Sequence, residues 1–179
     1  MSEALRKAFL IDQFHAMVLQ ATVQRAAIYE PSAPEESREQ FRGGLRKALA
    51  RAALGYADVT TEEAHLDAIV TLSGEITEAH AAALRGGRFR IGPAQKSLNL
   101  FLKYLWCSGE IPMPPHCPFD AVVIARLPSS MYVPWTRIDS IEAYVRLVAA
   151  ARVAAGDRSL ADWELHLYQV AYAGASRAV

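Results

Sequence analysis

Residues 86–120 read GGRFRIGPAQKSLNLFLKYLWCSGEIPMPPHCPFD, and we expect the rest of the fold to be organised around them. The stretch contains a glycine turn, an apolar helical segment, a proline-rich connection and then a single acid, Asp120. Free N–H groups at a helix entry favour anions, so basic side chains placed there suit contact with phosphate. Between residues 81 and 109 every charged side chain is basic: Arg85, Arg88, Arg90, Lys96 and Lys103.

The apolar segment predicts a helix over about residues 93–107. Pro93 suits the start of a helix, where its missing N–H has no intrahelical partner to lose. The residues after it are apolar on nearly every side except for Lys96 and Lys103, which are seven residues apart and share one face. We therefore expect this helix to be central and largely buried.

Apolar residues at helical spacing also occur on both sides of this segment. Residues 120–126 are too short for their periodicity to distinguish a helix from a strand. The predicted architecture is one compact all-α domain covering residues 1–179, with six or seven helices and a helix-hairpin-helix element. The other helices are expected over about residues 2–29, 32–56, 60–84, 139–155 and 159–172.

Short polar motifs predict where four of these helices begin. A hydroxyl or carboxylate side chain followed three residues later by Glu is typical of a helix N-terminus, because both side chains cap free N–H groups. A lone serine in the same place can act as a simple N-cap. The expected caps are Ser32 with Glu35, Thr60 with Glu63, Asp139 with Glu142, and Ser159.

The composition is that of a single globular domain. The chain has 179 residues, enough for one domain with a real core, and its 52% hydrophobic and 21% charged residues exclude the disordered class. A formal net charge of zero argues against a general polyanion binder, so any nucleic-acid surface has to be a local patch. No apolar run approaches the roughly 20 residues that span a bilayer. We expect a cytoplasmic protein without membrane association, and nothing in the sequence sets an oligomeric state.

The cysteine content predicts no disulfide framework and no metal centre. The chain contains only Cys107 and Cys117, which fits a reduced, intracellular setting. His116 lies beside Cys117, but a structural zinc site needs four ligands and no fourth is evident nearby. We expect neither a metal nor another cofactor.

The hairpin FRIGPAQKSLN resembles that of the helix-hairpin-helix DNA glycosylase superfamily, and the resemblance covers about residues 75–130. The run QKSLNLFLKYLW, followed by IPMPPHCPFD, looks most like the archaeal 8-oxoguanine glycosylase branch. In that superfamily a lysine on the helix after the hairpin attacks the sugar carbon that bears the damaged base. An aspartate beyond a proline-containing loop assists it. The resemblance therefore implies Lys96 as nucleophile and Asp120 as its assistant, with Lys103 as the alternative nucleophile.

The resemblance also implies contacts with nucleic acid, in the first place DNA. Phosphate contacts are expected from the basic turn and the hairpin, although Ile91-Gly92-Pro93 supplies one glycine where the family usually has two. Asp120 is equally suited to cap a helix after Pro118. A target base has to leave the stack, so an aromatic wall is expected near the lysine. The expected phosphate contacts are Arg85, Arg88, Arg90, Gly92 and Lys103, and the expected aromatic wall is Phe101, Tyr104, Trp106 and Phe119.

The sequence thus favours a DNA repair glycosylase that excises a damaged base, with or without lyase activity at the abasic site. Two other classes remain open. One is a non-catalytic helical module that binds nucleic acid through the basic turn. The other is a helical protein-interaction module in which the apolar helix is simply core. A steep salt dependence of DNA binding separates the first two classes from the third, and covalent trapping separates the first from the second.

Overall fold

The structure is a computed structural model that describes residues 2–23 and 26–176. Within these ranges it contains seven α-helices and no sheet, so the predicted all-α class is confirmed. No helix in the described part of the chain is long and apolar enough to cross a membrane. The helices are α1 (Glu3–Thr22), α2 (Glu35–Ala53), α3 (Glu62–His80), α4 (Ile91–Cys107), α5 (Ala121–Ile124), α6 (Ile141–Ala155) and α7 (Leu160–Ser176).

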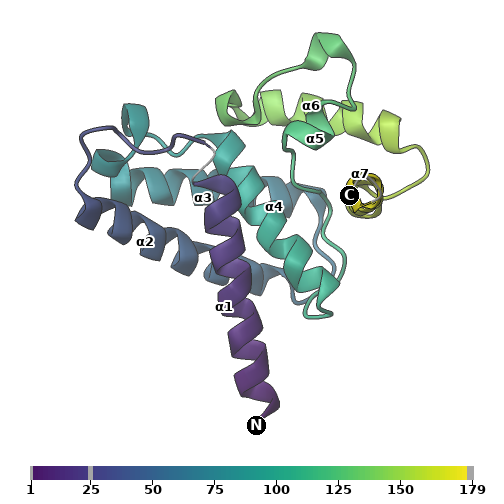
Figure 1. The fold of residues 1–179 in the computed structure, drawn as a ribbon. Helices are drawn as coiled ribbons and strands as arrows, with labels where there is room; N and C mark the ends of the chain where they lie inside the picture. Colours follow the sequence, from purple (N-terminus) through teal and green to yellow (C-terminus); the bar gives the residue numbers. More distant parts are fainter. Residues whose placement is uncertain (1, 24–25, 177–179) are drawn as a thin grey trace.

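Helix α4 lies at the centre of the molecule, as its apolar sequence predicts. It packs against α1, α2, α3 and α6 (Figure 1). Every residue from Ile91 to Asn99 is buried, including several polar ones. The N-terminal half of α1 projects away from the other helices (Figure 1).

The connection between α3 and α4 is longer than the sequence predicts. Helix α3 ends at His80 rather than near Leu84, and two short 3₁₀ turns follow it. Gly86 and Gly87 adopt φ angles of 66° and 67°, the left-handed conformation expected of them. Helix α4 then begins two residues before Pro93. This is tolerated because Pro93 still lies in the first turn, where its missing N–H breaks no intrahelical bond.

The prediction that the first helix continues to residue 29 is wrong. Helix α1 ends at Thr22, and the chain beyond it pairs with the segment that precedes α4. The N–H of Glu30 donates to Ala83 O at 3.0 Å, and the N–H of Arg85 donates to Ile28 O at 2.8 Å. This extended pairing excludes a helix. Residues 24 and 25 of the predicted range lie outside the described residues.

Three of the predicted N-caps are displaced by one or two residues. Thr61 caps α3 by accepting from the N–H of Ala64, and Ser140 caps α6 in the same way, so neighbouring residues take the places predicted for Thr60 and Asp139. The capping box at Ser32 is absent because Pro34 occupies the cap position of α2 and makes no side-chain bond. The cap at Ser159 is confirmed, since its Oγ accepts from the N–H of Asp162 at 3.1 Å.

Two fully buried histidines give the fold a predictable dependence on pH. Burial lowers the pKa of His65 to about 3 and that of His116 to about 4, with smaller contributions from neighbouring charges. In the unfolded chain both imidazoles titrate near about 6.5. Below that pH the unfolded state therefore binds more protons than the folded state. Their contribution to stability is complete above about pH 6.5 and is lost as the pH falls toward about 4.

We therefore expect the melting temperature to fall when the pH is lowered from 7 to 5. Each of the two histidines should weaken folding by about 1–2 kcal/mol over this interval. Circular dichroism melts at half-unit pH steps measure the effect. The variant His166→Gln, which changes an exposed histidine, should keep the full slope. A melting temperature that stays constant from pH 7 to 5 would contradict this account.

Candidate active site

One face of α4 forms the floor of a cleft of about 610 Å³. Its side chains recur every three or four residues, as one face of a helix requires: Lys96, Leu100, Lys103, Tyr104 and Cys107. Helices α1 and α7 and the loop that leads into α5 supply the walls. The wall residues are Met17, Gln20, Ala21, Pro118, Asp120, Val122, Glu164, Leu165 and Tyr168.

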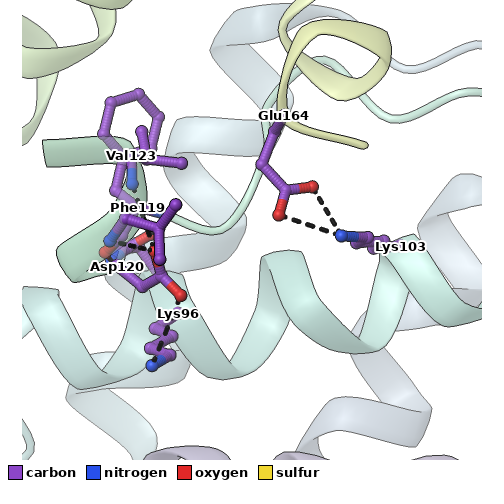
Figure 2. A network of polar contacts seen from close by, with 8 residues as sticks. Lys96, Lys103, Phe119, Asp120, Val123 and Glu164 are labelled. Atoms are coloured by element: carbon purple, nitrogen blue, oxygen red, sulfur yellow. Dashed lines mark hydrogen bonds and ion pairs between the residues drawn. The ribbon is translucent and has the colours of Figure 1, made fainter. Parts of the chain in front are cut away.

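The cleft brings together the two residues that the sequence predicts as catalytic. Lys96 Nζ lies 4.0 Å from Asp120 Oδ2, and only 5% of the Lys96 side chain is exposed, against 32% for Asp120 (Figure 2). The same Nζ lies 4.1 Å from the centroid of the Trp135 ring. A buried ammonium is costly unless nearby groups replace its water, and here a carboxylate and an aromatic face lie close enough to do so.

Asp120 is held in this position by the start of α5. Its Oδ1 accepts from the N–H of Val122 at 2.9 Å and from the N–H of Val123 at 3.2 Å, so the predicted N-cap is confirmed. The cap leaves Oδ2 as the oxygen that approaches Lys96 (Figure 2). The cap also settles residues 121–124 as helix. A single carboxylate thus caps a helix with one oxygen and faces an amine with the other.

Lys103 occupies the same cleft but in a different electrostatic setting. Its Nζ lies 2.6 and 2.9 Å from the two carboxylate oxygens of Glu164 (Figure 2). The same Nζ lies 4.6 Å from the centroid of the Tyr168 ring. Burial raises the pKa of Glu164, and the ammonium of Lys103 opposes that rise. The two-oxygen contact holds the Lys103 nitrogen inside the cleft, so it is poorly placed to reach a phosphate outside.

Of the four aromatic residues expected near the lysine, only Tyr104 lines the cleft. Phe101 stacks on His15 in the core, and Phe119 packs edge-on against Tyr144. Trp106 is half-buried outside the cleft lining. Each residue advances about 100° around a helix, so these α4 positions point away from the Lys96 face.

Sequence reasoning missed the aromatic and acidic residues that do surround the two lysines. Trp135 begins a short 3₁₀ turn (Trp135–Arg137) between α5 and α6, and Tyr168 and Glu164 lie one turn apart on α7. No local pattern connects these positions with Lys96 or Lys103.

The three arginines of the basic turn surround a smaller hollow of about 270 Å³ at the entry of α4. Arg85, Arg88 and Arg90 line it together with Arg137, which the sequence analysis did not single out. Asp139 is the acid paired with this group, at 3.3 Å from Arg88 and 3.9 Å from Arg90. One carboxylate against four guanidinium groups leaves the hollow basic.

Gly92 plays a different part from the one expected of a hairpin glycine. Its N–H donates to Ile138 O at 2.8 Å, so this amide is not available to a phosphate. A Cβ built on Gly92 would lie 1.8 Å from the carbonyl oxygen of Trp135. The absence of a side chain therefore lets residues 135–138 approach the first turn of α4. This approach brings the Trp135 ring over Lys96.

The cysteines and histidines do not gather into a metal site. Among the described residues there is no group of three or more His, Cys, Asp or Glu side chains that could hold a metal ion. Cys107 is exposed at the cleft, whereas Cys117 is buried. The titratable groups that line the cleft are therefore the two lysines, the two acids, two tyrosines and one thiol.

No family model matches the chain, and no curated protein or solved structure is significantly similar to it. Function therefore has to be argued from the cleft itself.

The close approach at Gly92 gives a direct test of how the site is assembled. We expect Gly92→Ala to lower the melting temperature by several degrees, because overpacking a filled site costs about 1–3 kcal/mol. Gly74→Ala in α3 is the matched control, since a Cβ there meets no atom within 4 Å. That variant should be neutral or slightly stabilising. Equal melting temperatures for the two variants would show that residues 135–138 do not pack as described.

Proposed function

We propose that the protein is a DNA glycosylase of the helix-hairpin-helix type that uses Lys96 as nucleophile and Asp120 as its acid–base partner. The observation that carries the proposal is the 4.0 Å approach of the Lys96 amine to the Asp120 carboxylate inside a cleft. The cleft volume of about 610 Å³ lies in the range that accommodates small-molecule groups, including a nucleobase with its sugar.

The two side chains suit the chemistry of base excision. The amine nitrogen of Lys96 attacks C1′ of the sugar, and the bond from C1′ to the base breaks with its electron pair leaving on the base. Before attack the amine has to lose a proton, which the Asp120 carboxylate can accept. Asp120 passes this proton to the departing base, so that a neutral base leaves. The nitrogen then gives up a second proton, which goes to O4′ as the C1′–O4′ bond breaks and the C1′=N bond forms. The product is a protonated imine with the opened sugar, which hydrolysis or elimination of the strand then resolves.

The length of the cleft suggests how the substrate would lie. Lys103 is seven residues beyond Lys96, about 10 Å further along the axis of α4. The Lys103–Glu164 pair and the Tyr168 ring would then lie beside the extruded base. A carboxylate can accept from base N–H groups, and an aromatic ring can stack on the base.

The arginine hollow would hold the DNA backbone at the other end. Pro93, one turn before Lys96, lines this hollow, so the two sites are separated by about 4.5 Å along the helix axis. Under this proposal Arg85, Arg88, Arg90 and Arg137 contact phosphate through guanidinium groups. In this proposal the connection between α3 and α4 corresponds to the hairpin of the glycosylase superfamily. The Gly92 N–H is already bonded to Ile138 O, so arginine side chains rather than backbone amides contact the phosphate.

Borohydride trapping on duplexes that contain an abasic site, 8-oxoguanine or uracil tests the proposal. We expect wild type and Lys103→Ala to form a reduced covalent complex with at least one of these duplexes and Lys96→Ala to form none. Asp120→Asn keeps an oxygen for the α5 cap but cannot accept the proton, so its trapping rate should fall about a hundredfold or more. A glycosylase without lyase activity forms no complex that borohydride can trap, so the released base is also measured by chromatography.

A covalent complex that survives Lys96→Ala would overturn the assignment of the nucleophile. If wild type neither forms a complex nor releases a base from any duplex, the glycosylase proposal fails. DNA binding that persists in that case, with a steep dependence on salt, would identify the non-catalytic nucleic-acid-binding module instead.

A further inference from the structure

The side chain of Gln95 makes a two-point contact with the backbone of Phe119. Its Nε2 donates to Phe119 O at 2.9 Å, and its Oε1 accepts from the N–H of Phe119 at 3.1 Å. Gln95 is fully buried. It immediately precedes Lys96 on α4, and Phe119 immediately precedes Asp120. The contact therefore joins the two chain segments that carry the reacting pair at the residues next to that pair.

We propose that Gln95 is a positioning residue that sets the distance between Lys96 and Asp120. This inference rests on the proposed function for its catalytic meaning, but the contact itself can be tested without DNA. The segment before Asp120 forms no regular structure and its prolines lack N–H donors, so its backbone groups depend on side chains for hydrogen bonds. Buried backbone groups need partners, and for Phe119 the partner is the amide of Gln95.

The orientation of the Gln95 amide is itself determined by a buried network. Asn99, one turn later on α4, donates through Nδ2 to Gln95 Oε1 at 3.2 Å and to Tyr144 Oη at 3.0 Å. Gln95 Oε1 thus accepts two hydrogen bonds, one from Asn99 and one from the N–H of Phe119. If the amide were flipped, the Gln95 NH₂ group would face these two donors. The oxygen of Gln95 is thereby directed to the Phe119 N–H and its nitrogen to the Phe119 carbonyl.

The network continues from Tyr144 to the surface of α3. His116 Nδ1 lies 2.9 Å from Tyr144 Oη, and His116 Nε2 lies 3.3 Å from Glu62 Oε1. Burial lowers the pKa of His116 to about 4 and raises that of Tyr144 well above its ordinary value. His116 and Tyr144 are therefore both neutral near pH 7. The network links the Gln95 contact to α4, α6 and the loop before α5.

Three variants separate positioning from general stability. Gln95→Met keeps the length of the side chain and removes both bonds to Phe119. Gln95→Glu keeps an acceptor for the Phe119 N–H and loses the donor to its carbonyl. Ser97→Ala is the matched control, because Ser97 is fully buried on the same helix and its hydroxyl makes no hydrogen bond among the described residues.

The first readout does not depend on any DNA activity. Reductive methylation with formaldehyde and cyanoborohydride, resolved by peptide mass spectrometry, gives the labelling rate of Lys96 relative to the exposed Lys47. Asp120→Asn removes the negative charge that faces the amine, and we expect labelling to rise about three- to tenfold. Gln95→Met should raise it in the same direction, and Ser97→Ala should stay within about twofold of wild type.

The decisive comparison is the double variant Gln95→Met with Asp120→Asn. If Gln95 acts through Asp120, the double variant labels no faster than Asp120→Asn alone, because the two changes remove the same interaction. If Gln95 only stabilises the fold, its effect multiplies that of Asp120→Asn. A multiplicative result overturns the inference, and so does an unchanged labelling rate in either single variant.

The second readout is catalytic. With abasic DNA in single turnover, Gln95→Met should lower the trapping rate about ten- to a hundredfold while the Kd for DNA stays within about twofold. Gln95→Glu should retain more of the rate than Gln95→Met. Equal losses in Gln95→Met and Ser97→Ala would overturn the inference. Failure of wild type to react with any duplex would count against the proposed function, and the labelling comparison would still decide the role of Gln95.

Discussion

A buried lysine ammonium that faces a carboxylate and an aromatic ring is the interaction on which the rest of this structure depends. Removing Lys96 from water carries a large desolvation cost, so Asp120 and Trp135 have to be held close to it. Both partners come from the part of the chain between α4 and α6. Two neighbours on the first turns of α4 fix them: Gly92 leaves room for the Trp135 backbone, and Gln95 bonds to the residue before Asp120. The first turns of α4 thus hold both partners of the Lys96 amine in place.

Three groups of charged side chains follow one another along α4. The arginine hollow lies at the entry of α4, the Lys96–Asp120 pair one turn further, and the Lys103–Glu164 pair two turns beyond that. In the proposed function these three positions correspond, in order, to the phosphate, the sugar and the base of one nucleotide. The two lysines share a face but differ in geometry: both oxygens of Glu164 contact Lys103, whereas Asp120 caps α5 with one oxygen and approaches Lys96 with the other.

Local periodicity predicts the helices well because each must bury an apolar face, and α4 is central because its sequence is apolar nearly all round. That same uniformity hides which face carries the site, so Phe101 and Trp106 of the expected aromatic wall lie outside the cleft lining. Phe119 lies in the loop before α5, where no periodicity predicts a direction. Lys96 and Asp120, the pair implied by the resemblance to glycosylases, do lie close together. Trp135 and Glu164 could not be predicted, because their contacts join residues far apart in sequence and leave no local pattern.

Peptide mapping of the reduced DNA complex is the most direct test of the central claim that Lys96 is the reacting amine. After borohydride reduction with abasic DNA, nuclease and protease digestion leaves a sugar remnant on the residue that attacked C1′. Our account predicts this remnant on the peptide that contains Lys96 and on no other. A remnant on Lys103, on a surface lysine or on the N-terminal amine would contradict it, because the cleft would then contain no selectively reactive lysine at position 96.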